Sequence, residues 1–431
     1  MEILLIGNGF DLEHNLPTSY PDFLKFCEKA RRIYTYDEKV SVDVYQKENL
    51  EGWIIDSSIR DALFHAFKDR DVCTTTKDDG SFSISVSTPN KYLDELYPLI
   101  SQNTWLEYFL NCPSYIGDDW IDFESEISRV IRALDAGRFQ VSCDGNITNV
   151  EHGYGVLLTA IWKAAKTSLK NTYKDIAAID EFTSHLDSEL NSLIRALEIY
   201  ISGFVHNIPV PRKSPDIEKL NPDHILSFNY SDTYERIYGL DKDISYDFIH
   251  GKADIEHNIR NCNMVLGIDE YLEDSCKNDE LQFIAFKKYY QRIYKATGNK
   301  YLNWIDIIER GYDEYVRKIG LVHTGQPDSL NGIPWQRRLH ISTAGIDYPK
   351  HTLYIFGHSL DVTDGDVLRK LICNENVQTK IFYYRKYEDD KRTLGKMIKN
   401  LVRIIGQDEL IRRTGGAHKT IEFIPQTLHE K

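Results

Sequence analysis

The first residues of the chain constrain its fold more than any other stretch. Four apolar residues, Ile3–Ile6, lead directly into the turn Gly7-Asn8-Gly9. A short apolar run without polar alternation is typical of a strand buried on both faces, as in a parallel sheet. A helical pattern follows at Phe23–Cys27, and Thr18 or Ser19 is its expected N-cap. The sequence therefore predicts a strand, a glycine turn and a helix at the start of an α/β fold.

Strand patterns return after a linker that contains four prolines between residues 209 and 222. Short apolar runs predict strands at residues 224–228, 246–249, 264–266, 353–356 and 380–384. With the first run included, five of the six are followed directly by Gly, Asn or His. Ligands of open parallel sheets bind just beyond the carboxyl ends of the strands, so these polar residues are the candidates for a site.

The region between the first strand and the linker is mainly helical in pattern. Two stripes predict helix faces that pack in a core: Phe123, Ile127, Val130 and Ile131, then Leu186, Leu190, Leu193, Leu197 and Tyr200. Residues 73–90 are polar and rich in Ser and Thr, which indicates a loop or a small hairpin. We therefore predict a discontinuous sheet core, residues 1–30 plus 220–431, and a mainly helical insertion or cap, residues 31–219.

Composition limits the kind of protein. The chain has 431 residues, 42% of them hydrophobic and 12% aromatic, which is enough for a large core. Its net charge of −14 makes a nucleic-acid-binding surface an unfavoured interpretation. The basic tracts, Lys287-Lys288 and Arg385–Arg413, mix with acids and indicate solvated helix faces.

Cysteine usage and hydropathy suggest where the protein works. The seven cysteines are scattered without a CxxC pair, which predicts reduced thiols and no zinc ribbon. The N-terminus lacks a basic segment followed by a long apolar run, and no stretch approaches the roughly 18–20 apolar residues of a membrane helix. We expect a soluble, cytoplasmic protein that does not bind a membrane.

The first candidate ligand-binding segment is the turn Gly7-Asn8-Gly9 together with Phe10 and Asp11. Glycines between a strand and a helix let the backbone approach a phosphate or a ribose closely. The alternative is a tight turn without a ligand, since glycine is also what a positive φ requires.

The second and third candidates end the next two strands. In Ser227-Phe228-Asn229, the carboxamide of Asn229 could hold a water by donating and accepting hydrogen bonds, with Asp232 nearby. Alternatively, Asn229 and Asp232 cap the helix that follows. At His250-Gly251 the histidine could act as a base or relay while Gly251 leaves room for a ligand, or the histidine could be structural.

The fourth candidate is the segment that begins Gly357-His358-Ser359 and continues to Asp361. His358 and Ser359 could face a ligand, and Asp361 could bind a ribose hydroxyl. The alternative is a turn before a helix that Thr363 or Asp364 caps. The segment does not match the G-x-S-x-G pattern of a nucleophile elbow. Its acids resemble a helix start more than a metal site, so no metal is expected.

Five blocks of this sequence resemble one protein family. They are IGNGFDLEHNLPTSYPDFLKF, WIDFESEIS, ILSFNYSDTYE, FIHG and YIFGHSLDVTDGDVLRKLI. Together they resemble the signature blocks of the AbiH family of bacteriophage abortive-infection proteins, in order and over most of the chain. The resemblance implies an anti-phage effector and a phage-derived trigger, and we also expect a homo-oligomer.

A looser resemblance is to SIR2-like proteins, which have a Rossmann-like core that binds NAD. It implies a Rossmann-like α/β fold with NAD as ligand or substrate. Asn229 and His250 would then be the catalytic pair that hydrolyses the bond to nicotinamide. The zinc module of sirtuins is absent, which argues against deacylation, and Asp11 is an unusual acid at the first turn. A nucleotide sensor without turnover and a nucleic-acid-targeting effector are the alternatives.

Overall fold

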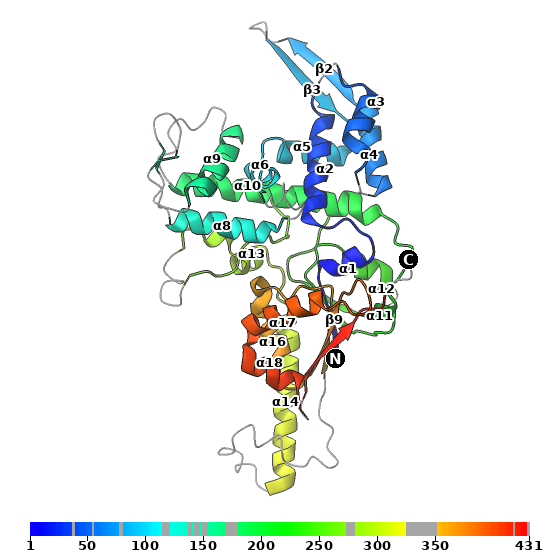
Figure 1. The fold of residues 1–431 in the computed structure, drawn as a ribbon, viewed down its shortest axis with the longest axis vertical. Coiled ribbons are helices and arrows are strands. Elements are labelled where there is room, and N and C mark those ends of the chain that lie inside the picture. Colours follow the sequence, from blue (N-terminus) through cyan, green and yellow to red (C-terminus); the bar gives the residue numbers. More distant parts are fainter. Residues whose placement is uncertain are drawn as a thin grey trace.

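The computed structural model has two parts, a sheet core and a helical lobe above it (Figure 1). It describes residues 1–36, 39–53, 56–76, 81–113, 121–136, 140–141, 147–148, 154–168, 179–240, 242–272, 281–324, 351–416 and 419–428. Among these residues, no helix combines the length and the apolar character that crossing a membrane requires.

The core is one six-stranded sheet in which every strand runs parallel to its neighbours. The strands are β1 (Glu2–Ile6), β6 (His224–Ser227), β7 (Ser245–Phe248), β8 (His351–Phe356), β9 (Val377–Tyr383) and β10 (Ile421–Pro425). Their order across the sheet is β7-β6-β1-β8-β9-β10. Numbered along the chain, this is the Rossmann order 3-2-1-4-5-6, which reverses between β1 and β8. The prediction of a Rossmann-like α/β fold is confirmed.

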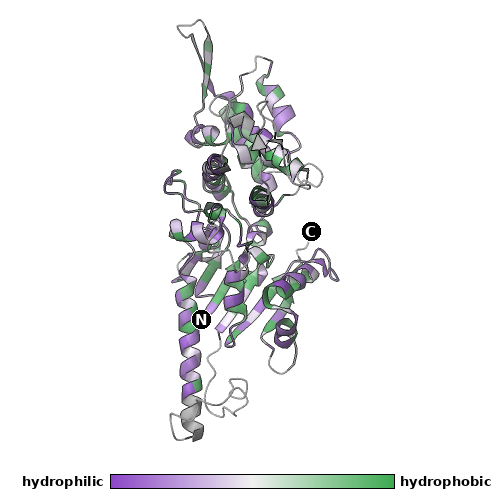
Figure 2. Ribbon diagram, turned by 90° about the vertical axis from the view of Figure 1, so that its left-hand side faces the viewer, coloured by the Kyte–Doolittle hydropathy of each residue, from purple (hydrophilic) through white to green (hydrophobic). Residues whose placement is uncertain are grey.

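Both faces of the sheet are covered, as the first strand predicts. Ile3 and Leu5 pack against one group of helices, whereas Leu4 and Ile6 pack on the opposite face. The first group is α14 (Tyr301–Thr324), α16 (Gly365–Ile372), α17 (Arg392–Ile405) and α18 (Gln407–Thr414). The opposite face carries α11 (Pro215–Glu218) and α12 (Thr233–Tyr238). Figure 2 shows the apolar strands between these helices.

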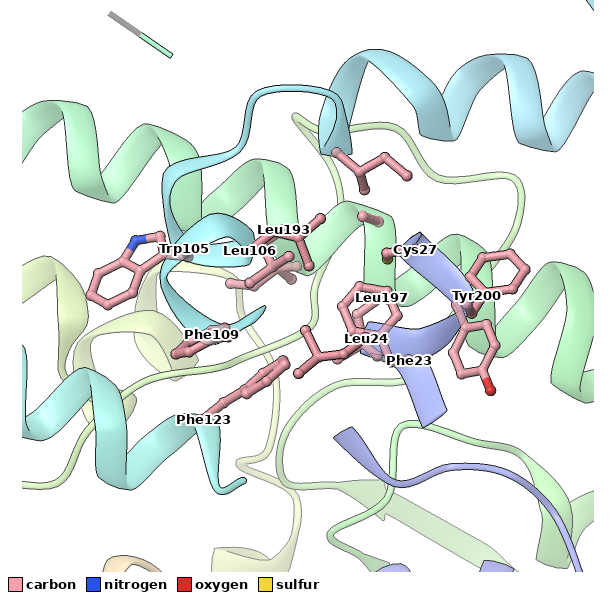
Figure 3. Packing of buried hydrophobic residues seen from close by; sticks show 14 of the residues in the cluster. Phe23, Leu24, Cys27, Trp105, Leu106, Phe109, Phe123, Leu193, Leu197 and Tyr200 are labelled. Carbon is pink, nitrogen blue, oxygen red and sulfur yellow. The ribbon is translucent and has the colours of Figure 1, made fainter. Parts of the chain in front are cut away.

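The helical lobe has a separate buried cluster. Its helices are α2 (Tyr20–Ile33), α3 (Val42–Tyr45), α4 (Ser57–Lys68), α5 (Lys91–Ile100), α6 (Thr104–Leu110), α8 (Phe123–Ala136), α9 (Gly155–Ser168) and α10 (Ile179–Ile199). Two π-helical segments, η1 (Gln46–Leu50) and η2 (Tyr200–Phe204), extend α3 and α10. All members of both predicted stripes are buried, and several meet in Figure 3. Helix α2 also packs in this cluster, and Ser19 is its N-cap, as predicted.

The remaining elements are short. They are α1 (Asn8–Glu13), α13 (Lys288–Tyr294), the 3-10 helices η3 (Val205–Asn207), η4 (Ile284–Phe286) and η6 (Val362–Asp364), and two small antiparallel sheets. One sheet pairs β2 (Asp71–Thr76) with β3 (Phe82–Ser87), which confirms the predicted hairpin. The other pairs β4 (Gln140–Val141) with β5 (Ile147–Thr148). The predicted limits of the core and the insertion stay predictions.

One strand prediction is wrong, and one strand of the core sheet was missed, as were the short strands β4 and β5. Residues 264–266 are buried but form no strand, because their backbone bonds elsewhere. Val265 N donates to His250 O, and Leu266 N donates to the Gln291 side chain. The edge strand β10 was not predicted, since its apolar residues alternate with Glu422 and end at Pro425.

Candidate functional site

The turns after β1 and β8 lie in contact at the point where the strand order reverses. Gly7 N donates to Phe356 O at 3.1 Å, and Gly9 N donates to Gly357 O at 2.8 Å. A Cβ on Gly7 would lie 2.7 Å from the His358 Cα, and one on Gly9 would lie 2.8 Å from the Gly357 Cα. The glycines are thus required by the contact between the two turns. A positive φ does not explain Gly7, whose backbone is extended (φ −123°).

Above these turns lies a cavity of about 340 Å³, within the usual size range of small-molecule sites. Residues from the sheet core and from the helical lobe both line it. The predicted residues on its wall are Gly7, Asn8, Gly9, Asp11, Asn229, His250, Gly357, His358, Ser359 and Asp361. The lobe contributes α8 and the junction of α10 with η2, through Glu124, Leu197 and Ile201.

Four predicted ligand-binding residues do not line this cavity. Phe10 lies beneath the turn, packed between His14 and Phe356. Asp232 lies beside a different, small hollow, where its carboxylate is 3.0 Å from His206 Nδ1. Gly251 (φ 79°) packs against the backbone of Asn263. Ser227 is buried behind Asn229.

Asn229 lies two residues after the end of β6, at the cavity wall. Its backbone is fixed by Ser227, whose hydroxyl accepts from Asn229 N and donates to Asn229 O, both at 3.1 Å. The residue is 5% exposed, yet neither Oδ1 nor Nδ2 has a hydrogen-bond partner among the residues that the structure describes. The carboxamide therefore does not cap the next helix. A buried amide without partners is costly for the fold unless something else binds it.

Asp11 connects the first turn with the Asn229 turn. Its Oδ2 accepts a hydrogen bond of 2.6 Å from Ser231 Oγ, and Thr233 Oγ1 in turn donates to Ser231 Oγ. The other oxygen, Oδ1, is buried and has no hydrogen-bond partner in the described part of the chain. Burial raises the pKa of Asp11 to about 6, although the Ser231 hydrogen bond opposes the shift. Asp11 therefore braces the Asn229 turn and still lines the cavity.

Two imidazoles flank Phe228 and approach one carboxylate. The ring of Phe228 lies 5.5 Å from that of His250 and 4.5 Å from that of His358. His358 Nδ1 accepts from Leu360 N at 2.9 Å, which leaves the proton on Nε2, 3.3 Å from Asp364 Oδ2. His250 Nε2 lies 3.3 Å from Asp364 Oδ1 but forms no hydrogen bond there.

Lys288, at the start of α13, joins the sheet core to the lobe. Its Nζ lies 3.0 Å from Asp364 Oδ1 and 2.7 Å from Glu124 Oε2. Both Lys288 and Lys287 are buried, and Lys287 Nζ pairs with Glu270 at 2.8 Å. The predicted solvated face is therefore wrong for this tract. It is also wrong for Arg413, which is buried against the carboxylates of Glu375 and Glu409.

The roles of the acids after β8 also differ from the prediction. Asp361 caps η6 by accepting from Thr363 N at 3.1 Å, whereas Asp364 forms no side-chain cap. Asp364 is instead the charged centre of the cluster. Burial opposes its ionisation, but the Lys288 ammonium and then the His358 imidazole hold the pKa of Asp364 well below its usual range.

Burial and Lys288 set the protonation of the other two members of the cluster. Burial raises the pKa of Glu124 to about 7, against the effect of the neighbouring ammonium. Burial and then Lys288 lower the pKa of His250, so its imidazole is neutral at pH 7. A neutral base and a carboxyl group that titrates near neutrality thus lie on one cavity wall, which suits proton transfer.

The cavity wall is acidic. Five carboxyl groups line it, those of Asp11, Asp122, Glu124, Asp361 and Asp364, and no Lys or Arg of the described residues does. In the same part of the chain, no three His, Cys, Asp or Glu side chains are arranged to hold a metal ion. The wall favours a ligand whose buried part is neutral or positively charged.

Sequence reasoning missed Glu124 and Lys288 for a physical reason. Glu124 lies on α8 beside the apolar stripe from which the helix was recognised, and Lys288 is more than 160 residues away along the chain. Only their packing brings them together. The available signal was the resemblance block WIDFESEIS, which contains Glu124.

Comparison with known proteins identifies a family. A family model described as bacteriophage abortive infection AbiH matches residues 3–385, which includes every residue on the cavity wall. No curated protein and no solved structure matches the chain.

Proposed function

The chain belongs to the AbiH family of bacteriophage abortive-infection proteins, and we propose that its cavity binds NAD and hydrolyses the N-glycosidic bond to nicotinamide. The observation that carries the proposal is the Asn229 carboxamide, which is buried just beyond a strand end and has no hydrogen-bond partner within the described ranges. It has one acceptor and two donor positions to offer a water and a ribose. The looser resemblance to SIR2-like proteins supports the same pair, Asn229 and His250.

In the proposed reaction, nicotinamide leaves with the electron pair of the glycosidic bond. Asn229 holds a water on the opposite side of C1′, and the water oxygen forms the new bond to C1′ while its proton is released. The neutral imidazole of His250 accepts a hydrogen bond from a ribose hydroxyl. The products are nicotinamide, ADP-ribose and a proton.

The acidic wall supports a particular orientation of NAD. The nicotinamide ring is cationic in the substrate, and positive charge spreads onto the ribose as the bond breaks. The carboxylates that are ionised around this end would stabilise the transition state. They would repel a pyrophosphate, so the nicotinamide riboside half would occupy the cavity and the pyrophosphate its mouth.

The test is nicotinamide release from NAD by the wild type and by two asparagine variants. Asn229→Ala should lower release at least about 100-fold without lowering the unfolding midpoint, because the amide it removes has no partner. Asn103→Ala is the matched control. Asn103 is as buried, but it donates to Glu189 O and caps α6 through Leu106 N. Asn103→Ala should lower the free energy of unfolding by about 1–2 kcal/mol. Its nicotinamide release per folded molecule should equal that of the wild type.

Either of two outcomes would reject hydrolysis at this site. Equal release by wild type and Asn229→Ala would mean that the reaction occurs elsewhere. No release by wild type, combined with binding of ADP-ribose that Asn229→Ala abolishes, would support the second candidate, a nucleotide sensor. The observation behind that candidate is the Lys288 contact with Glu124 and Asp364, through which a ligand could change how the lobe sits on the sheet.

A further inference from the structure

The hairpin β2–β3 projects from the end of the helical lobe that lies far from the sheet core (Figure 1). Its register places Val72 opposite Val86, Thr74 opposite Ile84 and Thr76 opposite Phe82. Residues that pair directly share a face of the ribbon, and neighbours along a strand alternate between faces. One face therefore carries only apolar and β-branched side chains: Val72, Thr74, Thr76, Phe82, Ile84 and Val86.

The opposite face is polar, and two of its hydroxyls form hydrogen bonds within the ribbon. It carries Asp71, Cys73, Thr75, Ser83, Ser85 and Ser87. The hydroxyl of Ser83 donates to Thr75 O at 3.4 Å, and that of Ser85 donates to Cys73 O at 3.5 Å. The ribbon is thus amphipathic, with a sharp division between its two faces.

The apolar face is left largely open. Val72 is 37%, Ile84 47% and Phe82 71% exposed, while Val86 at the base packs against the lobe. A two-stranded ribbon is marginally stable in water unless one face is covered. An exposed apolar strand surface of this kind marks an interaction site.

We propose that the apolar face of this ribbon packs against the same face of a second copy of the chain. The choice of partner rests on charge. Residues 72–76 and 82–87 contain no charged residue, in a chain whose net charge is −14. Two copies would repel each other over most surfaces but not here. A partner recognised by charge would find no complementary group on this face.

The face is also complementary to itself. Two antiparallel ribbons related by a two-fold axis can stack their apolar faces as a small β-sandwich, with each Phe82 against the aliphatic side chains of the other copy. Six residues span about 20 Å, and two strands span about 10 Å. This footprint of about 200 Å² per copy is well below that of a standard specific interface, so the dimer should be weak and reversible, with a Kd in the high micromolar range.

The full-length chain tests this by analytical ultracentrifugation over a range of micromolar concentrations. The wild type should show a concentration-dependent dimer. Phe82→Glu/Ile84→Glu should raise the dimer Kd at least tenfold, because each copy places two charges in the contact. Ser83→Glu/Ser85→Glu is the matched control, since it adds the same charges to the same strand on the polar face. It should leave the Kd within about twofold of wild type.

Three results would overturn the proposal. They are a wild-type chain that is monomeric throughout, equal dimerisation of all three proteins, and equal loss of the dimer in both variants. A further variant, Phe82→Ser/Ile84→Thr, removes apolar area without adding charge and should also weaken the dimer. Circular dichroism and the unfolding midpoint should match wild type in every variant, because neither substituted pair belongs to the buried core. The inference does not depend on what the cavity binds.

Discussion

Two pairs of turns at the same edge of the sheet differ in how they use their polar atoms. The turns after β1 and β8 close on each other, with Gly9 N bonded to Gly357 O and no space for a Cβ. The turns after β6 and β7 leave the Asn229 carboxamide and His250 Nε2 without hydrogen-bond partners among the described residues. Buried polar groups are rarely left unpaired. The glycines are thus explained by folding, whereas the second pair of turns is not.

Among the tests of this comparison, the substitution Gly357→Ala should have the largest effect on stability. Gly357 has a φ of 68°, and a Cβ there would lie 2.1 Å from Phe10 N. The unfavourable φ and the backbone clash together should lower the free energy of unfolding by about 4 kcal/mol or more. Urea unfolding monitored by circular dichroism measures the loss.

Gly395→Ala is the control for this substitution. Gly395 lies inside α17. Apart from its chain neighbours and its own helix backbone, no atom of the described residues lies within 4 Å of the place that its Cβ would take, so alanine should be neutral or stabilise by up to about 1 kcal/mol. If Gly357→Ala were as well tolerated, the contact between the two turns would not be the reason for these glycines.

The second test removes the positive charge of Lys288, which lies near the turns after β6 and β7. In Lys288→Met, the buried carboxylates of Asp364 and Glu124 lose their shared ammonium. Breaking a buried ion pair from one side is strongly destabilising, and we expect a loss of about 3 kcal/mol in the free energy of unfolding. A urea midpoint at pH 7 measures it.

Lys287→Met separates this effect from the loss of any buried lysine. Lys287 is equally buried, but its partner Glu270 is 28% exposed and can return to water. The control should therefore cost about 1 kcal/mol. If the two substitutions lowered the free energy of unfolding equally, the contact of Lys288 with both lobe and sheet would not explain its effect.

The sheet and its site were predictable to different extents. The run Ile3–Ile6 indicated a strand covered on both faces, because no polar residue interrupts it, and the strand ends then located Asn229 and His250. Residues 264–266 misled the same reasoning, since a short buried run looks alike whether its backbone pairs with a strand or with side chains. The pattern of apolar residues thus indicates that a segment is buried, but it does not indicate whether the segment pairs with a strand.

The charged half of the site could not be read from local patterns. Lys288 follows another lysine, and nothing in its neighbourhood distinguishes a buried ammonium from a solvated one. Its partners Glu124 and Asp364 come from α8 and η6, which are distant in sequence. Only the assembly of lobe and sheet makes these three residues one cluster, so the sequence could predict the strand-end residues but not the group behind them.

The smallest expected effect concerns Asp11, which links the two pairs of turns. Burial raises the pKa of Asp11 to about 6, above its ordinary value of 3.8. The folded state therefore holds this proton more tightly than the unfolded state, and the resulting stabilisation is lost as the pH rises through about 6. Asp11→Asn cannot titrate. The stability of the variant relative to wild type should thus improve by about 2 kcal/mol between pH 4 and pH 8.

Unfolding midpoints of both proteins across this pH range measure the change, and Asp22→Asn controls for acids in general. Asp22 lies in the first turn of α2, where Ser19 is its partner, and not on the cavity wall. A pH-independent difference between Asp11→Asn and wild type would mean that Asp11 is ionised throughout, and therefore that it is reached by water or by a cation. The turn after β1 would then hold a polar group that is open to a ligand, as the turn after β6 does. The contrast between the two pairs of turns would fail.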